Sequence, residues 1–214
     1  MPIIATVTNS ESANSEVDRK PKPVTAERLI GFSDGVIAVI ITIMVLQFVT
    51  PRGSDISALK PLIPVFLGYL LSFTVVGIYW NNHHHMMRAA RQIGAFVMWA
   101  NLHLLFWLAL LPFATAWLGQ HFASKWPTFL YGVICILCAL AYWILARAIA
   151  LANPEEAFAA SRRGRFGSGY KGNLSLLAYF VGVLLVFVNP AISLICYAFV
   201  SAIWFIPSRR LVNL

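Results

Sequence analysis

The chain has 214 residues, of which 59% are apolar and 11% are charged, and its mean hydropathy is +0.75. Soluble domains carry about 25% charged residues, so this composition excludes a soluble domain and predicts an all-α membrane protein. The net charge of +8 is better explained by basic residues at a membrane surface than by nucleic-acid binding, because no basic patch is interleaved with exposed aromatic residues.

The N-terminal part of the chain changes abruptly from polar to apolar. Residues 1–24 are polar and lack the apolar stretch of a signal peptide, so we expect a disordered cytoplasmic tail. The segment from Leu29 to Val49 is long enough to cross a bilayer and is stopped by a following threonine and proline. A second span is predicted from Leu59 to Trp80, and the polar stretch "NNHHHMMRAAR" is predicted to link it to the third.

Four further apolar segments bring the predicted number of transmembrane helices to six. They run from Ile93 to Leu118, from Trp126 to Leu151, from Leu174 to Val188 and from Ala191 to Ile206. A polar loop separates the fourth span from the fifth, and Asn189-Pro190 predicts a tight turn between the fifth and sixth. We therefore expect one transmembrane domain over residues 25–207 and a short cytoplasmic tail over residues 208–214.

Basic residues predict the orientation of these six spans. Of the 16 Lys and Arg residues, 13 fall in the two tails, the loop between spans 2 and 3, and the loop between spans 4 and 5. Only Arg52, Lys60 and Lys125 fall on the other side. Because cytoplasmic loops carry an excess of Lys and Arg, both termini are predicted to be cytoplasmic.

One acidic residue, Asp34, lies within a predicted span. The absence of a second acid in the spans argues against a hydrolase with paired carboxylates and against a pump that relays protons along acids. A carboxylate at this depth needs a partner, and Arg28, His83, His84 and His85 lie at the same predicted side. These residues suggest a polar network that fixes span 1 to span 2, or alternatively a pH-sensing or gating element, since histidine titrates near neutrality.

Histidine and cysteine positions do not predict a metal or haem site. Consecutive histidines on a helix point in different directions, so the triplet at 83–85 does not converge on one ion. His103 and His121 are roughly 27 Å apart along a helix axis. Cys135 and Cys138 form a C-x-x-C pair without a second pair, and with Cys196 they are expected to be small core residues.

The second half of span 1 presents a regular face. At 100° per residue, Asp34 lies about 140° from Val39, so the acid and the apolar stripe contact different neighbours. Ordinary helix packing explains such a stripe; if the acid packs against span 2, the stripe is free to contact a different neighbour. The residues on this face are Gly35, Val39, Thr42, Ile43 and Leu46.

The start of span 1 carries a recognisable motif. Arg28, Phe32, Ser33 and Asp34 form the pattern R-x-x-x-F-S-D, followed by "GVIAVIITIMVL". This segment resembles the signature of the transmembrane protein 175 family, the lysosomal and prokaryotic potassium channels. Trp80, His83 and His84 at the end of span 2 resemble the second signature of that family, and six spans with cytoplasmic termini resemble its prokaryotic members.

The resemblance implies a homotetramer in a prokaryotic cell membrane, with four copies of span 1 around a central pore. It implies a potassium-preferring channel without a re-entrant selectivity filter, whose permeant ion is K⁺ and which needs no cofactor. Carried over by position, Val39, Thr42 and Leu46 would form the constricting rings, with Ile43 beside them. The R-x-x-x-F-S-D residues, Trp80 and the span 2 histidines are implied to be a structural brace rather than part of the pore.

Two alternatives remain from other functional classes. The first is a proton-permeable protein or small-solute carrier that uses Asp34 and the histidines of span 2. The second is a membrane redox enzyme with histidine ligands, which a haem or metal absorption band in purified protein would reveal.

Overall fold

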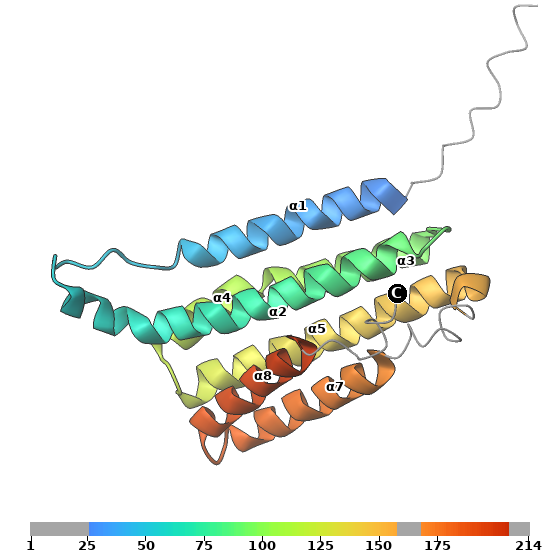
Figure 1. Cartoon of the computed structure of the whole chain (residues 1–214). Helices are drawn as coiled ribbons and strands as arrows, with labels where there is room; N and C mark the ends of the chain where they lie inside the picture. Colours follow the sequence, from blue (N-terminus) through green and yellow to red (C-terminus); the bar gives the residue numbers. More distant parts are fainter. Residues whose placement is uncertain (1–25, 158–167, 206–214) are drawn as a thin grey trace, which may run out of the picture.

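The computed structural model describes residues 26–157 and 168–205, and every regular element in these ranges is a helix (Figure 1). The all-α prediction is therefore confirmed for the described part of the chain. The predicted tails at 1–24 and 208–214, and residues 158–167 of the loop between spans 4 and 5, lie outside the described residues.

The first two long helices are α1 (Ala26–Val45) and α2 (Ile63–Arg88), with the short 3₁₀ helix η1 (Ile56–Leu62) between them. The sequence prediction that residues 81–91 form a link was wrong for most of that stretch, because α2 continues to Arg88 and includes all three consecutive histidines. A helix satisfies its own backbone hydrogen bonds, so polar side chains can prolong it beyond the apolar segment.

The predicted third span is two helices, α3 (Ala95–Ala109) and α4 (Leu111–Gln120). The interruption lies beside Pro112, which has no N–H group and whose ring crowds the carbonyl four residues earlier. At the junction, the N–H of Leu110 donates to the carbonyl of Trp107, three residues earlier, at 3.2 Å, which is the spacing of a 3₁₀ turn.

The remaining long helices are α5 (Lys125–Ala152), α7 (Ser168–Leu185) and α8 (Pro190–Phe205). The helix α7 starts before the predicted beginning of span 5 at Leu174. The tight turn predicted before α8 is confirmed, and there the Asn189 Oδ1 accepts the N–H of Ala191 at 2.9 Å.

Figure 1 shows α1 along one edge of the helix assembly and α7 along the opposite edge, with α2 to α5 between them. The helix α1 packs against α2, α3 and α4, while α7 packs against α5 and α8. Small residues allow the close crossings, since a Cβ atom on Gly119 of α4 would lie 2.9 Å from the Cα of Val65 on α2. The side chain of Tyr197 on α8 occupies the space left by Gly132 and Gly182.

Four stretches of the described chain are long and apolar enough to cross a membrane: Ala26–Val45, Ile56–Arg88, Ala95–Gln120 and Lys125–Ala152. Two more apolar helices, Lys171–Leu185 and Pro190–Trp204, are shorter. The membrane character is thus supported by helix length and composition, and the predicted count of six spans stays a prediction.

Candidate functional site

The helix α1 has one buried face and one exposed face. Its buried face contains Ser33 and four apolar residues, Leu29, Ile37, Ile40 and Met44. The opposite face carries Val39 (54% exposed), Ile43 (44%) and Leu46 (81%), and Thr42 is exposed beside them. All four residues predicted for the pore therefore lie on the face of α1 that the other described helices leave uncovered.

Thr42 differs from its aliphatic neighbours because it carries a hydroxyl. The Oγ1–H donates to the carbonyl of Val39, one turn earlier in the same helix, at 2.9 Å. With its proton directed to the backbone, the hydroxyl oxygen keeps lone pairs for an external donor or a cation. The exposed face of α1 thus offers one hydroxyl oxygen within an otherwise aliphatic stripe.

The N-terminal half of α1 is joined to α2 and α3 by a chain of hydrogen bonds. His83 on α2 and Asn101 on α3 are linked through Nε2 and Oδ1 at 2.7 Å. The Asn101 Nδ2 donates to Ser33 Oγ at 2.9 Å, and the Ser33 hydroxyl donates to the carbonyl of Leu29 at 2.8 Å. Ser33, His83 and Asn101 are all fully buried.

This chain of bonds determines which ring nitrogen of His83 carries the proton in the neutral ring. The Asn101 Oδ1 can only accept a hydrogen bond, so His83 Nε2 must carry the proton. The other nitrogen, Nδ1, is then an acceptor when the ring is neutral, and it is buried without a hydrogen-bond partner. We call Ser33, Asp34, Trp80, His83 and Asn101 the α1 brace.

Asp34 takes its partner from α2. Its Oδ1 accepts the indole N–H of Trp80 at 3.0 Å, and the ring of His84 lies 6.0 Å from the Trp80 ring. Arg28 and Phe32 are exposed, and no ion pair joins Arg28 to Asp34 in the described part of the chain. The structure therefore brings Ser33, Asp34, Trp80 and His83 together and leaves Arg28 and Phe32 outside that network.

Sequence reasoning missed Asn101, which connects the histidine of α2 to the serine of α1. The available signal was a single amide in the middle of a strongly apolar segment. A polar group at that depth needs a partner, because an unpaired one is costly in an apolar environment.

The C-terminal end of α1 is held by a second contact, which the sequence did not reveal. The Gln47 Nε2 donates to the carbonyl of Pro112 on α4 at 2.6 Å, while its Oε1 is buried without a partner. Nearby, the hydroxyls of Thr115 and Ser72 are hydrogen-bonded at 2.6 Å, and Ser72 bonds the Tyr131 hydroxyl at 3.1 Å.

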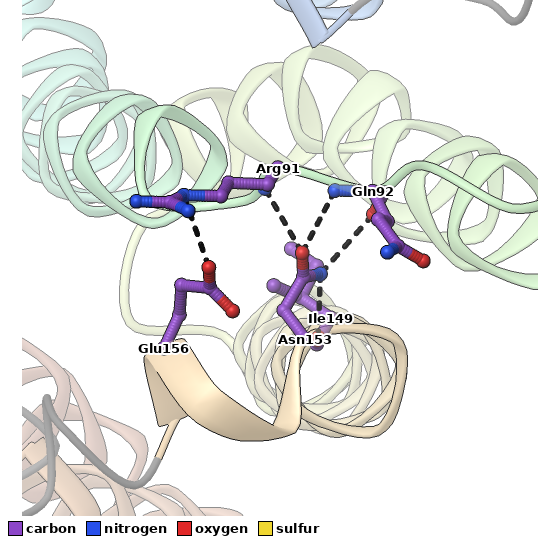
Figure 2. A network of polar contacts seen from close by, with 5 residues as sticks. All are labelled: Arg91, Gln92, Ile149, Asn153 and Glu156. Carbon is purple, nitrogen blue, oxygen red and sulfur yellow. Dashed lines mark hydrogen bonds and ion pairs between the residues drawn. The ribbon is translucent and has the colours of Figure 1, made fainter.

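The turn between α2 and α3 is fixed by Asn153, which lies just after the end of α5 (Figure 2). Its Oδ1 accepts the N–H groups of Arg91 and Gln92 at 2.9 and 2.8 Å. Its Nδ2 donates to the carbonyls of Gln92 and Ile149 at 3.1 and 3.0 Å. An ion pair of 3.0 Å between Arg91 and Glu156 closes the network, so one amide side chain organises the whole turn.

No three His, Cys, Asp or Glu side chains gather as metal ligands within residues 26–157 and 168–205. Cys135 and Cys138 are buried free thiols on α5, and Cys196 on α8 is partly buried. The described residues therefore present hydrogen-bonding networks and an exposed helix face, and among them no group of His, Cys, Asp or Glu side chains could hold a metal ion.

Comparisons with known proteins agree with the motif of α1. The family model described as "Endosomal/lysosomal potassium channel TMEM175" matches residues 28–112. A potassium channel of Chryseobacterium sp. (strain P1-3) is 43% identical over 189 residues, covering 88% of this chain and 96% of the relative. The human endosomal/lysosomal proton channel TMEM175 is 34% identical over 89 residues, covering 34% of this chain and 18% of that protein.

The similarity extends to three dimensions. The crystal structure of a lysosomal potassium-selective channel TMEM175 homologue from Chamaesiphon minutus matches with a TM-score of 0.70 and 25% sequence identity. The match covers 86% of this chain and 98% of that chain, so it includes helices beyond the region matched by the family model.

Proposed function

Because the chain belongs to the TMEM175 family of ion channels, we propose that it is a potassium-preferring channel in a cell membrane. In this proposal four subunits assemble with α1 around a central pore and both termini in the cytoplasm. The observation that carries the proposal is the uncovered face of α1, where Val39, Thr42 and Leu46 repeat at helical spacing.

The chemistry of this face suits a narrow cation pore. Rings of aliphatic side chains at Val39 and Leu46 would close the pore by expelling water when the helices approach each other. The ring of Thr42 between them would supply hydroxyl oxygens to an ion that has lost part of its hydration shell. Because K⁺ holds its hydration shell less strongly than Na⁺, such a constriction favours K⁺.

The α1 brace would keep that face directed towards the pore axis. Asp34 is bonded to Trp80, and Ser33 is bonded to Asn101, so both polar residues lie off the exposed face of α1. In the proposed channel they fix the rotation of the helix, and ions do not contact them. Arg28 and Phe32 are assigned to the cytoplasmic end of the same helix, outside the α1 brace.

Proton permeation is a second candidate function. A human relative is named a proton channel, and it matches this chain over 89 residues. His83 and Asp34 supply titratable groups in the N-terminal half of the α1–α2 pair. A pH-sensitive dye inside the same liposomes separates the two functions, since a potassium channel need not acidify them.

The test is potassium flux from liposomes that contain wild type, Thr42→Ala or Leu46→Ala. We expect Leu46→Ala to raise the flux, because a smaller ring dewets less readily, and Thr42→Ala to reduce the preference for K⁺ over Na⁺. Leu184→Ala on α7 is the matched control, since Leu184 is also an exposed leucine and α7 lies along the edge opposite α1 (Figure 1). Unchanged permeability and selectivity in both α1 variants would contradict the assignment of the pore to α1.

A further inference from the structure

A groove of about 430 Å³ lies between α5 and α7, on the side of the molecule remote from α1 (Figure 1). Its volume is within the range of roughly 300–1,000 Å³ that is typical of sites for small ligands. One polar side chain, Asn173, contributes to an otherwise apolar lining. The lining residues are Ile136, Leu140, Asn173, Leu176, Leu177 and Phe180.

The face of α5 that lines the groove also carries a basic residue, Arg147, further towards the end of the helix. Ile136, Leu140, Trp143 and Arg147 are spaced by four, three and four residues, so they share one face of the helix. The Arg147 guanidinium lies 5.6 Å from the centre of the Trp143 ring, and Trp143 is 57% exposed. Since α5 ends at Ala152, the guanidinium belongs to the last two turns of the helix.

The charge at this end of the groove is not balanced by the subunit. In the described residues the one ion pair joins Arg91 to Glu156, and no carboxylate pairs with Arg147. An arginine close to the hydrocarbon layer is costly unless an anion or the membrane interface receives it. Arginine binds phosphate oxygens through two parallel N–H bonds, and tryptophan favours the same interfacial depth.

We propose that the α5–α7 groove binds a phospholipid of the cytoplasmic leaflet, with one acyl chain along its apolar lining and the headgroup phosphate on Arg147. An anionic headgroup is preferred, because the site adds a positive charge and no negative one. This site goes beyond the proposed channel activity. If α1 surrounds the pore, the opposite edge with α5 and α7 faces lipid, which favours a lipid over a second copy of the chain as occupant.

The experiment measures lipid binding to the purified full-length protein by native mass spectrometry. Delipidated protein is titrated with phosphatidylglycerol and, separately, with phosphatidylcholine. The variants are Arg147→Gln, which removes the charge, and Leu177→Trp, which fills the groove. Their matched controls are Arg91→Gln, an exposed arginine outside the groove, and Leu184→Trp, an exposed leucine on α7 that does not line it.

We expect Arg147→Gln to weaken phosphatidylglycerol binding about fivefold, as for one basic residue near an anionic membrane surface, and to affect phosphatidylcholine less. Leu177→Trp should remove one bound lipid of either class, and both controls should bind like wild type. Circular dichroism and size-exclusion chromatography identify the variants that are folded, and either groove variant alone is sufficient for the test.

Three results would overturn the proposal. In the first, Arg147→Gln and Leu177→Trp bind both lipids as their controls do. In the second, inorganic phosphate displaces phosphatidylglycerol and Leu177→Trp has no effect, which would indicate an anion site without an acyl-chain site. In the third, Leu177→Trp lowers the oligomer mass without changing the number of lipids per subunit, which would assign the groove to a contact between copies.

Discussion

The two ends of α1 are held in different ways. In the N-terminal half, Ser33 bonds Asn101 on α3, which in turn bonds His83 on α2, and Asp34 separately bonds Trp80 on α2. At the C-terminal end, two contacts reach α4: the Gln47 amide donates to the backbone carbonyl of Pro112, and the Thr115 hydroxyl donates weakly to the Met44 sulfur at 4.0 Å. Within one helix, therefore, the N-terminal half is fixed by side-chain hydrogen bonds, and the C-terminal half is held mainly by apolar packing.

This difference has a consequence for the proposed channel. Directional hydrogen bonds fix the rotation of a helix, whereas apolar contacts are non-directional and tolerate small displacements. The exposed residues Thr42 and Leu46 lie towards the less constrained end. We expect opening movements to occur there, while the α1 brace remains in place.

Asn101→Leu should have the largest effect. It removes the amide and leaves the Nε2–H of His83 and the Oγ of Ser33 without this partner, and each unpaired buried group costs roughly 1–3 kcal/mol. We expect the free energy of unfolding in detergent to fall by about 3 kcal/mol. Asn81→Leu, at an exposed position of α2, is the control. Equal unfolding curves for the two variants would contradict the claim that the hydrogen bonds of Asn101 fix the N-terminal half of α1.

Gly119→Ala tests the packing of α4 against α2, since α4 is the helix that the less constrained end of α1 contacts. The new methyl group would lie 2.9 Å from the backbone of Val65, so α4 must move away from α2. Overpacking of this kind costs about 1–3 kcal/mol, measured as a loss of thermal stability. Gly77→Ala has no atom within 4 Å of its added methyl group and should be neutral or stabilising. Matching losses in both variants would show that helix packing at Gly119 is not the cause.

Trp80→Phe removes the indole N–H that Asp34 accepts. The interaction is partly exposed, so we expect a loss of about 1 kcal/mol or less in unfolding free energy. The K⁺ over Na⁺ preference in the liposome assay should stay at the wild-type value, because Asp34 lies off the exposed face of α1. A changed ion preference in a folded Trp80→Phe variant would mean that this half of α1 contacts the ions.

Gln47→Met should have the smallest effect. The substitution removes the bond to Pro112, worth about 1 kcal/mol, but it also removes the Oε1 atom that is buried without a partner. The two contributions nearly cancel, so the melting temperature should match that of the exposed control Gln120→Met. A large loss of stability would show that the C-terminal end of α1 is anchored as firmly as the N-terminal half.

Much of the fold could be predicted because membrane helices depend on local patterns. Long apolar segments predicted the helical class, and the asparagine before Pro190 predicted the turn that precedes α8. The break beside Pro112 was missed although proline is a helix breaker, because the apolar pattern runs through it without interruption. The extension of α2 to Arg88 was missed because polarity marks the end of the apolar layer and does not mark the end of a helix.

The two faces of α1 were determined by the sequence alone. A period of 3.6 residues is a local property, so it separated Asp34 from the Val39–Leu46 stripe before any neighbour was known. Only the tertiary structure decided which partner each polar residue takes. Asp34 bonds a tryptophan 46 residues away, and Ser33 bonds an asparagine 68 residues away. Such pairs depend on how the helices pack against one another, and no periodicity within a single helix specifies that packing.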